Sequence, residues 1–176
     1  YWLVDPLDGT KEFIKRNGEF SVNIALINNN TPVLGVVHAP ALGQTWIGQE
    51  GKNAIKITNG LEQELKVKER KLSEPWKVVG SRSHAGDSLN KFLESLGDYE
   101  LVSMGSSIKL CLVAEGAADI YPRLGPTSEW DTAAAHAVVN SAGGEVISME
   151  DEQPLRYNKK NLRNPFFIVR NPKNNY

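Results

Sequence analysis

Residues 1–10 read YWLVDPLDGT, an apolar run that ends in two carboxylates, a glycine and a threonine. The four apolar residues at the start, Tyr1–Val4, are typical of a strand that is covered on both faces. Pro6 has no N–H to donate and fixes its own φ. We therefore predict that a buried strand ends at Pro6 and that the chain turns there.

The polar end of this stretch predicts a phosphate held by metal. The turn directs Asp5, the carbonyl of Leu7 and Asp8 toward a common point. Such hard oxygen ligands suit Mg²⁺, Mn²⁺ or Ca²⁺, whereas zinc prefers His and Cys. Gly9 allows a ligand to approach the backbone, and Thr10 opens a predicted helix whose free N–H groups bind an anion. The alternative is a plain turn, because Asp-Pro and Asp-Gly are common turn dipeptides and Asp or Thr commonly caps a helix.

A second segment, Glu129–Ala135 with the sequence EWDTAAA, favours the metal site. Together the two segments resemble the signatures of the inositol monophosphatase superfamily, D-P-x-D-G-T and a later W-D-x-A-A. Residues 8–14 (DGTKEFI) and 80–84 (GSRSH) further resemble its 3′(2′),5′-bisphosphate nucleotidase branch. The inositol branch more often carries Asn where Glu12 stands. The resemblance extends from the first residue to about residue 170.

This resemblance implies a fold, a reaction and a cofactor. The expected fold is a layered α/β sandwich. The expected enzyme is a lithium-sensitive phosphatase that uses two or more Mg²⁺ ions and hydrolyses the 3′-phosphate of adenosine 3′,5′-bisphosphate to AMP. In relatives this reaction clears a by-product of sulfate activation. The expected partner is therefore a small nucleotide bisphosphate.

The resemblance also assigns roles to residues of the two signatures. It implies that metal is bound by four groups, namely Asp5, the Leu7 carbonyl, Asp8 and Asp131. Thr10 would orient the attacking water, the backbone near Gly9 and Thr10 would hold the scissile phosphate, and Asp131 would also contact the substrate. The alternative for Asp131 is a first-turn carboxylate that compensates the helix dipole. Without metal, two carboxylates about 4 Å apart repel by roughly 4 kcal/mol at an effective dielectric near 20, so bound cations would offset a real cost.

The nucleotide pocket is expected from three further parts of the chain. The resemblance places His84 beside the adenine or ribose, and it places Ser106, Ser107 and Lys109 in the same pocket. Lys109 and Arg123 suit the phosphate that is not hydrolysed, since Lys provides a point charge and Arg a fork. The alternatives are a satisfied structural histidine, two helix-capping serines and a solvated lysine.

Composition limits the possible partners and compartments. With 176 residues, 40% hydrophobic and 23% charged, the chain is long enough for one globular domain. A net charge of −1 gives no reason to expect nucleic acid polymers or an anionic membrane surface. The single cysteine, Cys111, excludes an internal disulfide, and its apolar neighbours predict a core position. With no membrane-length apolar run, we expect a cytoplasmic protein, with peripheral membrane association left open.

The first residue is Tyr1 and not Met, inside a predicted core strand. We expect the chain to be a fragment that lacks an N-terminal part. In the family, the acidic partner of Thr10 and a further glutamate ligand precede the first signature. The isolated chain is therefore expected to be inactive or nearly so.

Hydrophobic patterns predict an antiparallel half followed by an alternating α/β half. We expect strands over residues 20–26, 33–38, 45–48, 53–57 and 65–68, and then over 77–80, 99–104, 118–121, 145–148 and 166–169. Helices are expected over 11–15, 87–96, 106–115 and 130–142. Charge gathers before Pro75, so we predict a metal-site subdomain over residues 1–75 and a C-terminal α/β subdomain over 76–176.

Two other functions remain open at this stage. An inositol or sugar monophosphatase would keep the metal site but would have no use for Lys109 and Arg123 as a second phosphate clamp. A non-catalytic nucleotide or metal sensor would keep the pocket and lack turnover.

Overall fold

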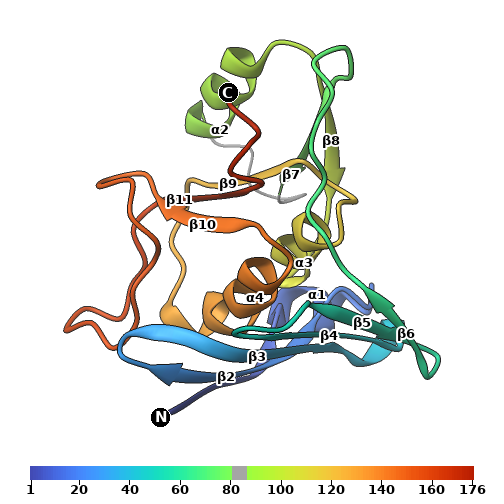
Figure 1. Ribbon diagram of the computed structural model, residues 1–176, viewed down its shortest axis with the longest axis vertical. Helices are drawn as coiled ribbons and strands as arrows, with labels where there is room; N and C mark the ends of the chain where they lie inside the picture. The colour runs from blue at the N-terminus through green and yellow to red at the C-terminus, as the bar shows by residue number, and fades with distance from the viewer. Residues whose placement is uncertain (81–86) are drawn as a thin grey trace.

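The computed structural model describes residues 1–80 and 87–176, which form two β-sheets with helices between and beyond them (Figure 1). The first sheet is antiparallel, and its six strands follow one another in sequence order. These strands are β1 (Trp2–Asp8), β2 (Ser21–Asn28), β3 (Thr31–Ala39), β4 (Gln44–Gln49), β5 (Ile55–Thr58) and β6 (Leu61–Glu64). A short 3₁₀ turn, Pro40–Leu42, joins β3 to β4.

The second sheet is mixed, with five strands in the order β10-β11-β9-β7-β8. Strand β7 runs parallel to both β8 and β9, while β11 pairs antiparallel with β9 and β10. Its strands are β7 (Trp76–Gly80), β8 (Tyr99–Ser103), β9 (Ile120–Arg123), β10 (Glu145–Ser148) and β11 (Phe167–Arg170). The helices are α1 (Thr10–Lys15), α2 (Asp87–Leu96), α3 (Ile108–Ala114) and α4 (Glu129–Ser141).

Helices α3 and α4 lie between the two sheets, and α2 covers the far side of the second sheet (Figure 1). The inner face of the first sheet lies very close to α4. A Cβ on Gly35 would lie 2.1 Å from the carbonyl oxygen of Ala134, and one on Gly48 would lie 2.4 Å from the Cα of Val138. Small residues on both sides thus bring the helix against the sheet. The predicted layered α/β architecture is confirmed.

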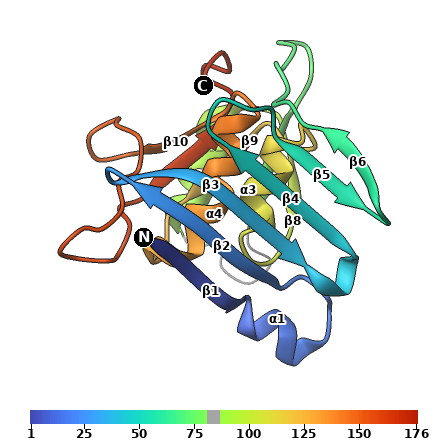
Figure 2. The ribbon, with the colours of Figure 1, turned by 60° about the horizontal axis from the view of Figure 1, so that its bottom comes forward.

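The first strand differs from its prediction. Strand β1 lies at the edge of the six-stranded sheet (Figure 2), and Trp2 is 60% exposed, so the Tyr1–Val4 run is not covered on both faces. Pro6 does not end the strand, which continues to Asp8. On an edge strand the missing N–H of proline need not interrupt a ladder, and the register instead shifts between Asp5 and Asp8.

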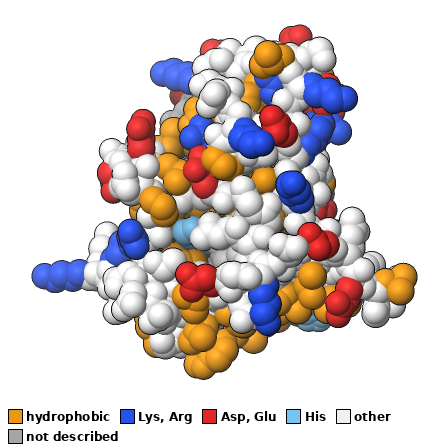
Figure 3. Space-filling view, viewed as in Figure 1, with side chains coloured by type: hydrophobic (Ala, Val, Ile, Leu, Met, Phe, Trp, Pro, Cys, Tyr) orange, Lys and Arg blue, Asp and Glu red, His pale blue; other side chains and the backbone are white. Residues whose placement is uncertain are grey.

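The phase of alternation in β2 is also unusual. Its apolar residues Val22, Ile24 and Leu26 lie on the outer face, while its buried face carries Ser21 and Asn23 together with Ala25 and Ile27. Hydrophobic side chains accordingly gather on the surface at the lower end of the molecule (Figure 3), where the first sheet lies. The polar pair on the buried face therefore lies on the side of the sheet that α4 covers.

The predicted edge strand also differs in position. Residues 65–68 form no strand, although Leu65 and Val67 are buried. The N–H of Leu65 donates to the carbonyl of Ala54, and the N–H of Val67 donates to the carbonyl of Ala142. This segment therefore makes isolated bonds to two parts of the chain and does not join a sheet ladder. The edge strand is β6, which forms a hairpin with β5 through Asn59-Gly60, both with positive φ. That Asn-Gly pair is a hairpin signal present in the sequence.

The two sheets divide the chain close to the predicted boundary at Pro75, while α4 from the second half packs on the first sheet. The subdomain division itself remains a prediction. No helix in the described parts of the chain is long and apolar enough to cross a membrane.

Candidate active site

The register shift in β1 places two carboxylates on the same face. Residues three apart on a regular strand point to opposite faces. Here Asp5 pairs with Asn23 and Asp8 with Ser21, and both partners lie on the buried face of β2. The N–H of Leu7 donates to Oδ1 of Asp5 at 3.1 Å. The irregular Pro6-Leu7 segment thus brings both acids to the side of the sheet that α4 covers.

Asp131 joins them from the first turn of α4. Oxygens of Asp5, Asp8 and Asp131 all lie within 4.8 Å of one another. One Asp131 oxygen, Oδ2, accepts the N–H of Ser128 at 2.8 Å. Both interpretations of Asp131 therefore hold geometrically, because the residue caps its helix and also completes an acidic cluster.

Asp8 is held by buried polar groups, of which the sequence analysis singled out Ser107 but not Asn23 or Ser21. Its Oδ2 accepts the N–H of Ser107 at 2.5 Å and the side-chain amide of Asn23 at 3.5 Å. The Ser107 hydroxyl donates to Oδ1 of Asn23 at 2.8 Å and lies 2.9 Å from the hydroxyl of Ser21. The sequence signal for Ser21 and Asn23 was their alternation with apolar residues in β2, which places these two polar residues on one face of the strand.

The alternative of two capping serines is not found at Ser107, because helix α3 begins at Ile108 and Ser107 makes no side-chain cap bond to it. The Oγ of Ser106 does accept the N–H of Ile108 at 3.4 Å. Ser106 adopts a positive φ of 47°, which turns the chain sharply before the helix. The backbone of this turn instead presents the Ser107 N–H to Asp8.

Burial raises the pKa of all three carboxyls. For Asp8 the Lys109 ammonium opposes this shift and the Asp131 charge adds to it. The N–H of Leu7 moderates the raised pKa of Asp5, and the N–H of Ser128 moderates that of Asp131. Partly desolvated carboxylates that repel one another favour a bound cation. An all-oxygen donor set fits a hard divalent ion such as Mg²⁺.

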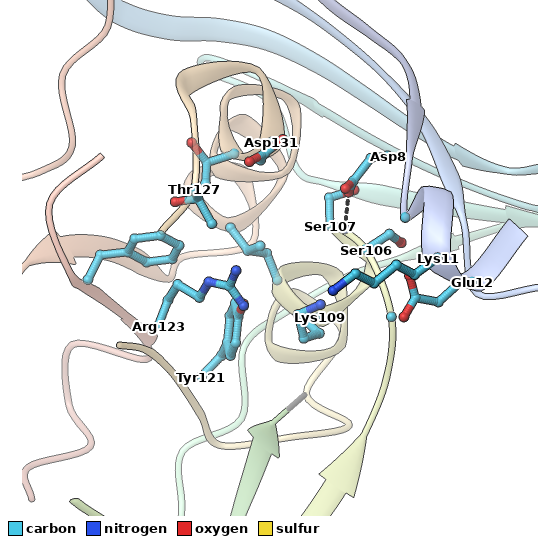
Figure 4. Close-up of a pocket in the computed structure, with 15 residues that line it drawn as sticks. Asp8, Lys11, Glu12, Ser106, Ser107, Lys109, Tyr121, Arg123, Thr127 and Asp131 are labelled. Carbon is cyan, nitrogen blue, oxygen red and sulfur yellow. Dashed lines mark hydrogen bonds between the residues drawn. The ribbon is translucent and has the colours of Figure 1, made fainter. Parts of the chain in front are cut away.

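A pocket of about 200 Å³ adjoins this cluster and is bounded by charges of both signs (Figure 4). Asp8 and Asp131 lie on one side, Lys109 and Arg123 lie on the other, and Lys11 enters from α1 beside Glu12. Lys109 is only 8% exposed, and burial lowers its pKa to about 8 despite the nearby Asp8. We call these two sides the acidic wall and the basic wall.

The basic wall continues into a second cavity. Arg123 donates from Nη2 to the carbonyl of Pro126 at 2.9 Å, and burial raises the pKa of neighbouring Tyr121 to about 12, which keeps its phenol neutral. Tyr121, Arg123 and Lys11 line both the first pocket and an adjacent cavity of about 440 Å³. Leu89 and Leu124 contribute apolar surface to the adjacent cavity.

The predicted site residues distribute as follows. The first pocket is lined by Asp8, Gly9, Ser106, Ser107, Lys109, Arg123 and Asp131. Asp5 belongs to the acidic cluster, whereas Leu7 and Thr10 are not among the lining residues of either cavity in the described chain. His84 lies outside the described residues. Lining residues that the sequence analysis missed include Lys11, Glu12, Tyr121 and Thr127.

Comparison with known proteins identifies the family. Residues 1–175 match the inositol monophosphatase family. The chain belongs to this family. Within the family it is 52% identical over 170 residues to the 3′(2′),5′-bisphosphate nucleotidase CysQ of Escherichia coli K12, covering 96% of this chain and 67% of that protein. It is 38% identical to CysQ of Haemophilus influenzae, covering 96% of this chain and 63% of that protein.

Solved structures of family members agree with the fold. The crystal structure of CysQ from Bacteroides thetaiotaomicron superposes with a TM-score of 0.90 at 46% identity, covering 99% of this chain and 70% of that one. Mycobacterium tuberculosis SuhB superposes with a TM-score of 0.78 at 22% identity, covering 98% of this chain and 67% of that one. The SuhB similarity supports the fold alone, whereas the CysQ relatives support the predicted nucleotidase branch.

Proposed function

We propose that this chain carries the catalytic centre of a Mg²⁺-dependent 3′(2′),5′-bisphosphate nucleotidase. The reaction is hydrolysis of the 3′-phosphate of adenosine 3′,5′-bisphosphate to AMP and phosphate. The main observation behind the proposal is one pocket that has an acidic wall and a basic wall. A substrate with two phosphates meets a cation-binding cluster on one side and fixed positive charges on the other. The similarity to CysQ nucleotidases supports the same substrate class.

On the acidic wall, Asp5, Asp8 and Asp131 are proposed as ligands of two or more Mg²⁺ ions, together with the Leu7 carbonyl. When bound, these ions supply a nucleophilic hydroxide and stabilise the leaving oxygen. The chain's own residues position the reactants: the backbone around Gly9 and Thr10 binds the scissile phosphate, and the Thr10 hydroxyl orients the attacking water.

On the basic wall, Lys109 and Arg123 are proposed to bind the phosphate that is not hydrolysed. Both lie across the pocket from the acids (Figure 4). Lys109 is nearly buried, so its charge acts with little screening by water. Arg123 offers a planar fork, and the buried Nε of this side chain has no partner within residues 1–80 and 87–176. His84 remains a proposed contact of the adenine or ribose.

The test compares substrates at fixed Mg²⁺. We expect kcat/KM to be at least about tenfold higher for adenosine 3′,5′-bisphosphate than for inositol 1-phosphate, because only the former uses the basic wall. A preference for inositol phosphate would overturn the substrate assignment. The chain covers 67% of the length of its E. coli relative and is expected to have little activity alone. The kinetic comparisons are therefore made on a protein of the relative's full length that contains this chain.

The proposed setting follows from the proposed reaction. Adenosine 3′,5′-bisphosphate is a by-product of sulfate activation, so we place the enzyme in sulfur metabolism and in the cytoplasm. Inhibition by millimolar lithium is expected from family membership. Nucleotide binding without phosphate release, measured by calorimetry beside a phosphate assay, would instead identify a sensor.

A further inference from the structure

Asn164 lies where the loop of residues 158–164 meets the first turn of α4. Its Nδ2 is 2.9 Å from the carbonyl oxygen of Ser128, 3.1 Å from Oγ1 of Thr132 and 3.2 Å from Oγ1 of Thr127. A carbonyl oxygen only accepts hydrogen bonds, so the amide nitrogen, not the oxygen, must face Ser128. The side chain therefore acts as a donor toward the start of the helix.

The backbone of Asn164 holds the same segment from a second direction. Its N–H donates to the carbonyl of Thr127 at 2.9 Å. That carbonyl belongs to the peptide unit whose other end is the Ser128 N–H, and the Ser128 N–H donates to Asp131 at 2.8 Å. One peptide unit is thus fixed at its oxygen by Asn164 and bonds Asp131 through its nitrogen.

The loop of residues 158–164 also forms hydrogen bonds with Glu129 at the start of the helix. This glutamate is 1% exposed, and its carboxylate accepts the N–H groups of Asn158 and Lys159 at 2.8 and 3.0 Å. The Lys159 ammonium lies 2.7 Å away and compensates the buried charge. The Glu129 N–H returns a bond to the carbonyl of Leu162 at 2.9 Å. The loop therefore holds the helix start at two points, at Glu129 and at the Thr127–Ser128 peptide that bonds Asp131.

Through Thr132, Asn164 contacts a buried network of polar side chains. The Thr132 hydroxyl lies 3.3 Å from the Tyr157 hydroxyl, which lies 2.9 Å from Nδ1 of His136. Burial lowers the pKa of His136 to about 3, so this imidazole is neutral and adds no charge to the site. Asn164 consequently rests on groups that are themselves fixed in the core.

We propose that Asn164 is a positioning residue for Asp131. By fixing the Thr127–Ser128 peptide, it holds one Asp131 oxygen in place and leaves the other for the cluster with Asp5 and Asp8. This inference rests on the proposed metal site. Groups that orient metal ligands typically change metal affinity by about 10–100-fold when removed.

The test measures Mn²⁺ affinity by electron paramagnetic resonance of the free ion, beside the Tm of the metal-free protein. Asn164→Ala should weaken Mn²⁺ binding at least about tenfold. The matched control is Asn161→Ala, since Asn161 is exposed and its side chain accepts only the N–H of Arg163 among the bonds described. The control should keep Mn²⁺ affinity within about twofold of the parent protein.

Asn164→Asp keeps the shape but replaces the donor with an acceptor. By charge alone an added carboxylate would tighten cation binding, so weaker binding by this variant supports positioning, and equal or tighter binding overturns it. If Asn164→Ala fails to fold, the Mn²⁺ affinity of Asn164→Asp decides whether Asn164 positions Asp131.

The Asp131→Asn variant distinguishes a failure of the proposed metal site from a failure of the positioning role of Asn164. If Asp131→Asn abolishes Mn²⁺ binding while Asn164→Ala only lowers Tm, the positioning role is wrong and the metal site stands. If Asp131→Asn binds Mn²⁺ like the parent protein, the metal site is wrong and this inference fails with it.

Discussion

The acidic and basic walls of the pocket face one another but are built differently. Asp5 and Asp8 lie on an edge strand, and Asp131 lies in the first turn of a helix. Lys109 comes from inside the buried helix α3, and Arg123 comes from a strand within the second sheet. Each wall gathers like charges, because Asp5, Asp8 and Asp131 repel one another, and Arg123 opposes the charge of Lys109. The walls differ in what they can bind, since the acidic wall offers oxygen ligands for a divalent cation and the basic wall offers positive charges for a phosphate.

The largest effect is expected on the acidic wall. Asp8→Asn should lower kcat/KM for adenosine 3′,5′-bisphosphate by at least about 10³-fold, because a cation ligand at the reacting phosphate is removed. Steady-state kinetics at saturating Mg²⁺ measure this. Asp87→Asn, a change at the exposed start of α2, is the control and should have parent activity. Activity of Asp8→Asn within tenfold of the parent would argue against the acidic wall as the catalytic side.

A smaller and more selective effect is expected on the basic wall. Arg123→Ala should lower kcat/KM for adenosine 3′,5′-bisphosphate by about 10–100-fold, the value of one or two charged hydrogen bonds. Adenosine 3′-phosphate lacks the second phosphate, so its kcat/KM should not change. Arg156→Ala, on the exposed loop, is the matched control. An equal loss of kcat/KM for both substrates would mean that Arg123 does not bind the second phosphate.

The binding of phosphate by the basic wall should depend on pH. Burial lowers the pKa of Lys109 to about 8, so the free enzyme loses this positive charge as the pH rises through that value. KM for the bisphosphate should therefore rise above about pH 8, while KM for adenosine 3′-phosphate should not. Lys109→Arg keeps its charge in this range and should remove the rise. A pH-independent KM in the parent protein would show that the ammonium form is not required.

The smallest effect concerns stability without metal. Burial and the Asp8 charge raise the pKa of folded Asp5, so its ionised form costs stability at neutral pH, and the cost disappears as the pH falls below the unfolded-state pKa. Asp5→Asn should stabilise the metal-free protein at pH 7 by on the order of 1 kcal/mol, the repulsion of two charges about 4 Å apart under water-like screening. Denaturant unfolding measures this. Added Mg²⁺ should stabilise the parent protein more than the variant, and the reverse order would contradict the cluster.

The sequence predicted most elements because their local patterns are strong. Helix α2 has the predicted bounds, and β10 does as well. The two signature segments named the three acids, which then meet within 4.8 Å. Cys111 is buried, as its apolar neighbours predicted.

Other features depend on long-range contacts that no local pattern reports. An apolar run such as Tyr1–Val4 does not distinguish a central strand from an edge strand whose outer face is apolar. The irregular register between Asp5 and Asp8 becomes visible only against β2. Asn23 and Asn164 bind the site from positions 15 residues after Asp8 and 36 residues after Ser128, and an isolated asparagine carries no signal of such a contact.

The most direct measurement is anomalous diffraction from a crystal of this protein soaked in Mn²⁺. The account predicts a manganese peak with one oxygen each from Asp5, Asp8 and Asp131 at coordination distances of roughly 2.0–2.6 Å. A peak bound by Asp5 and Asp8 with Asp131 more than about 4 Å away, or no peak at the cluster, would contradict it.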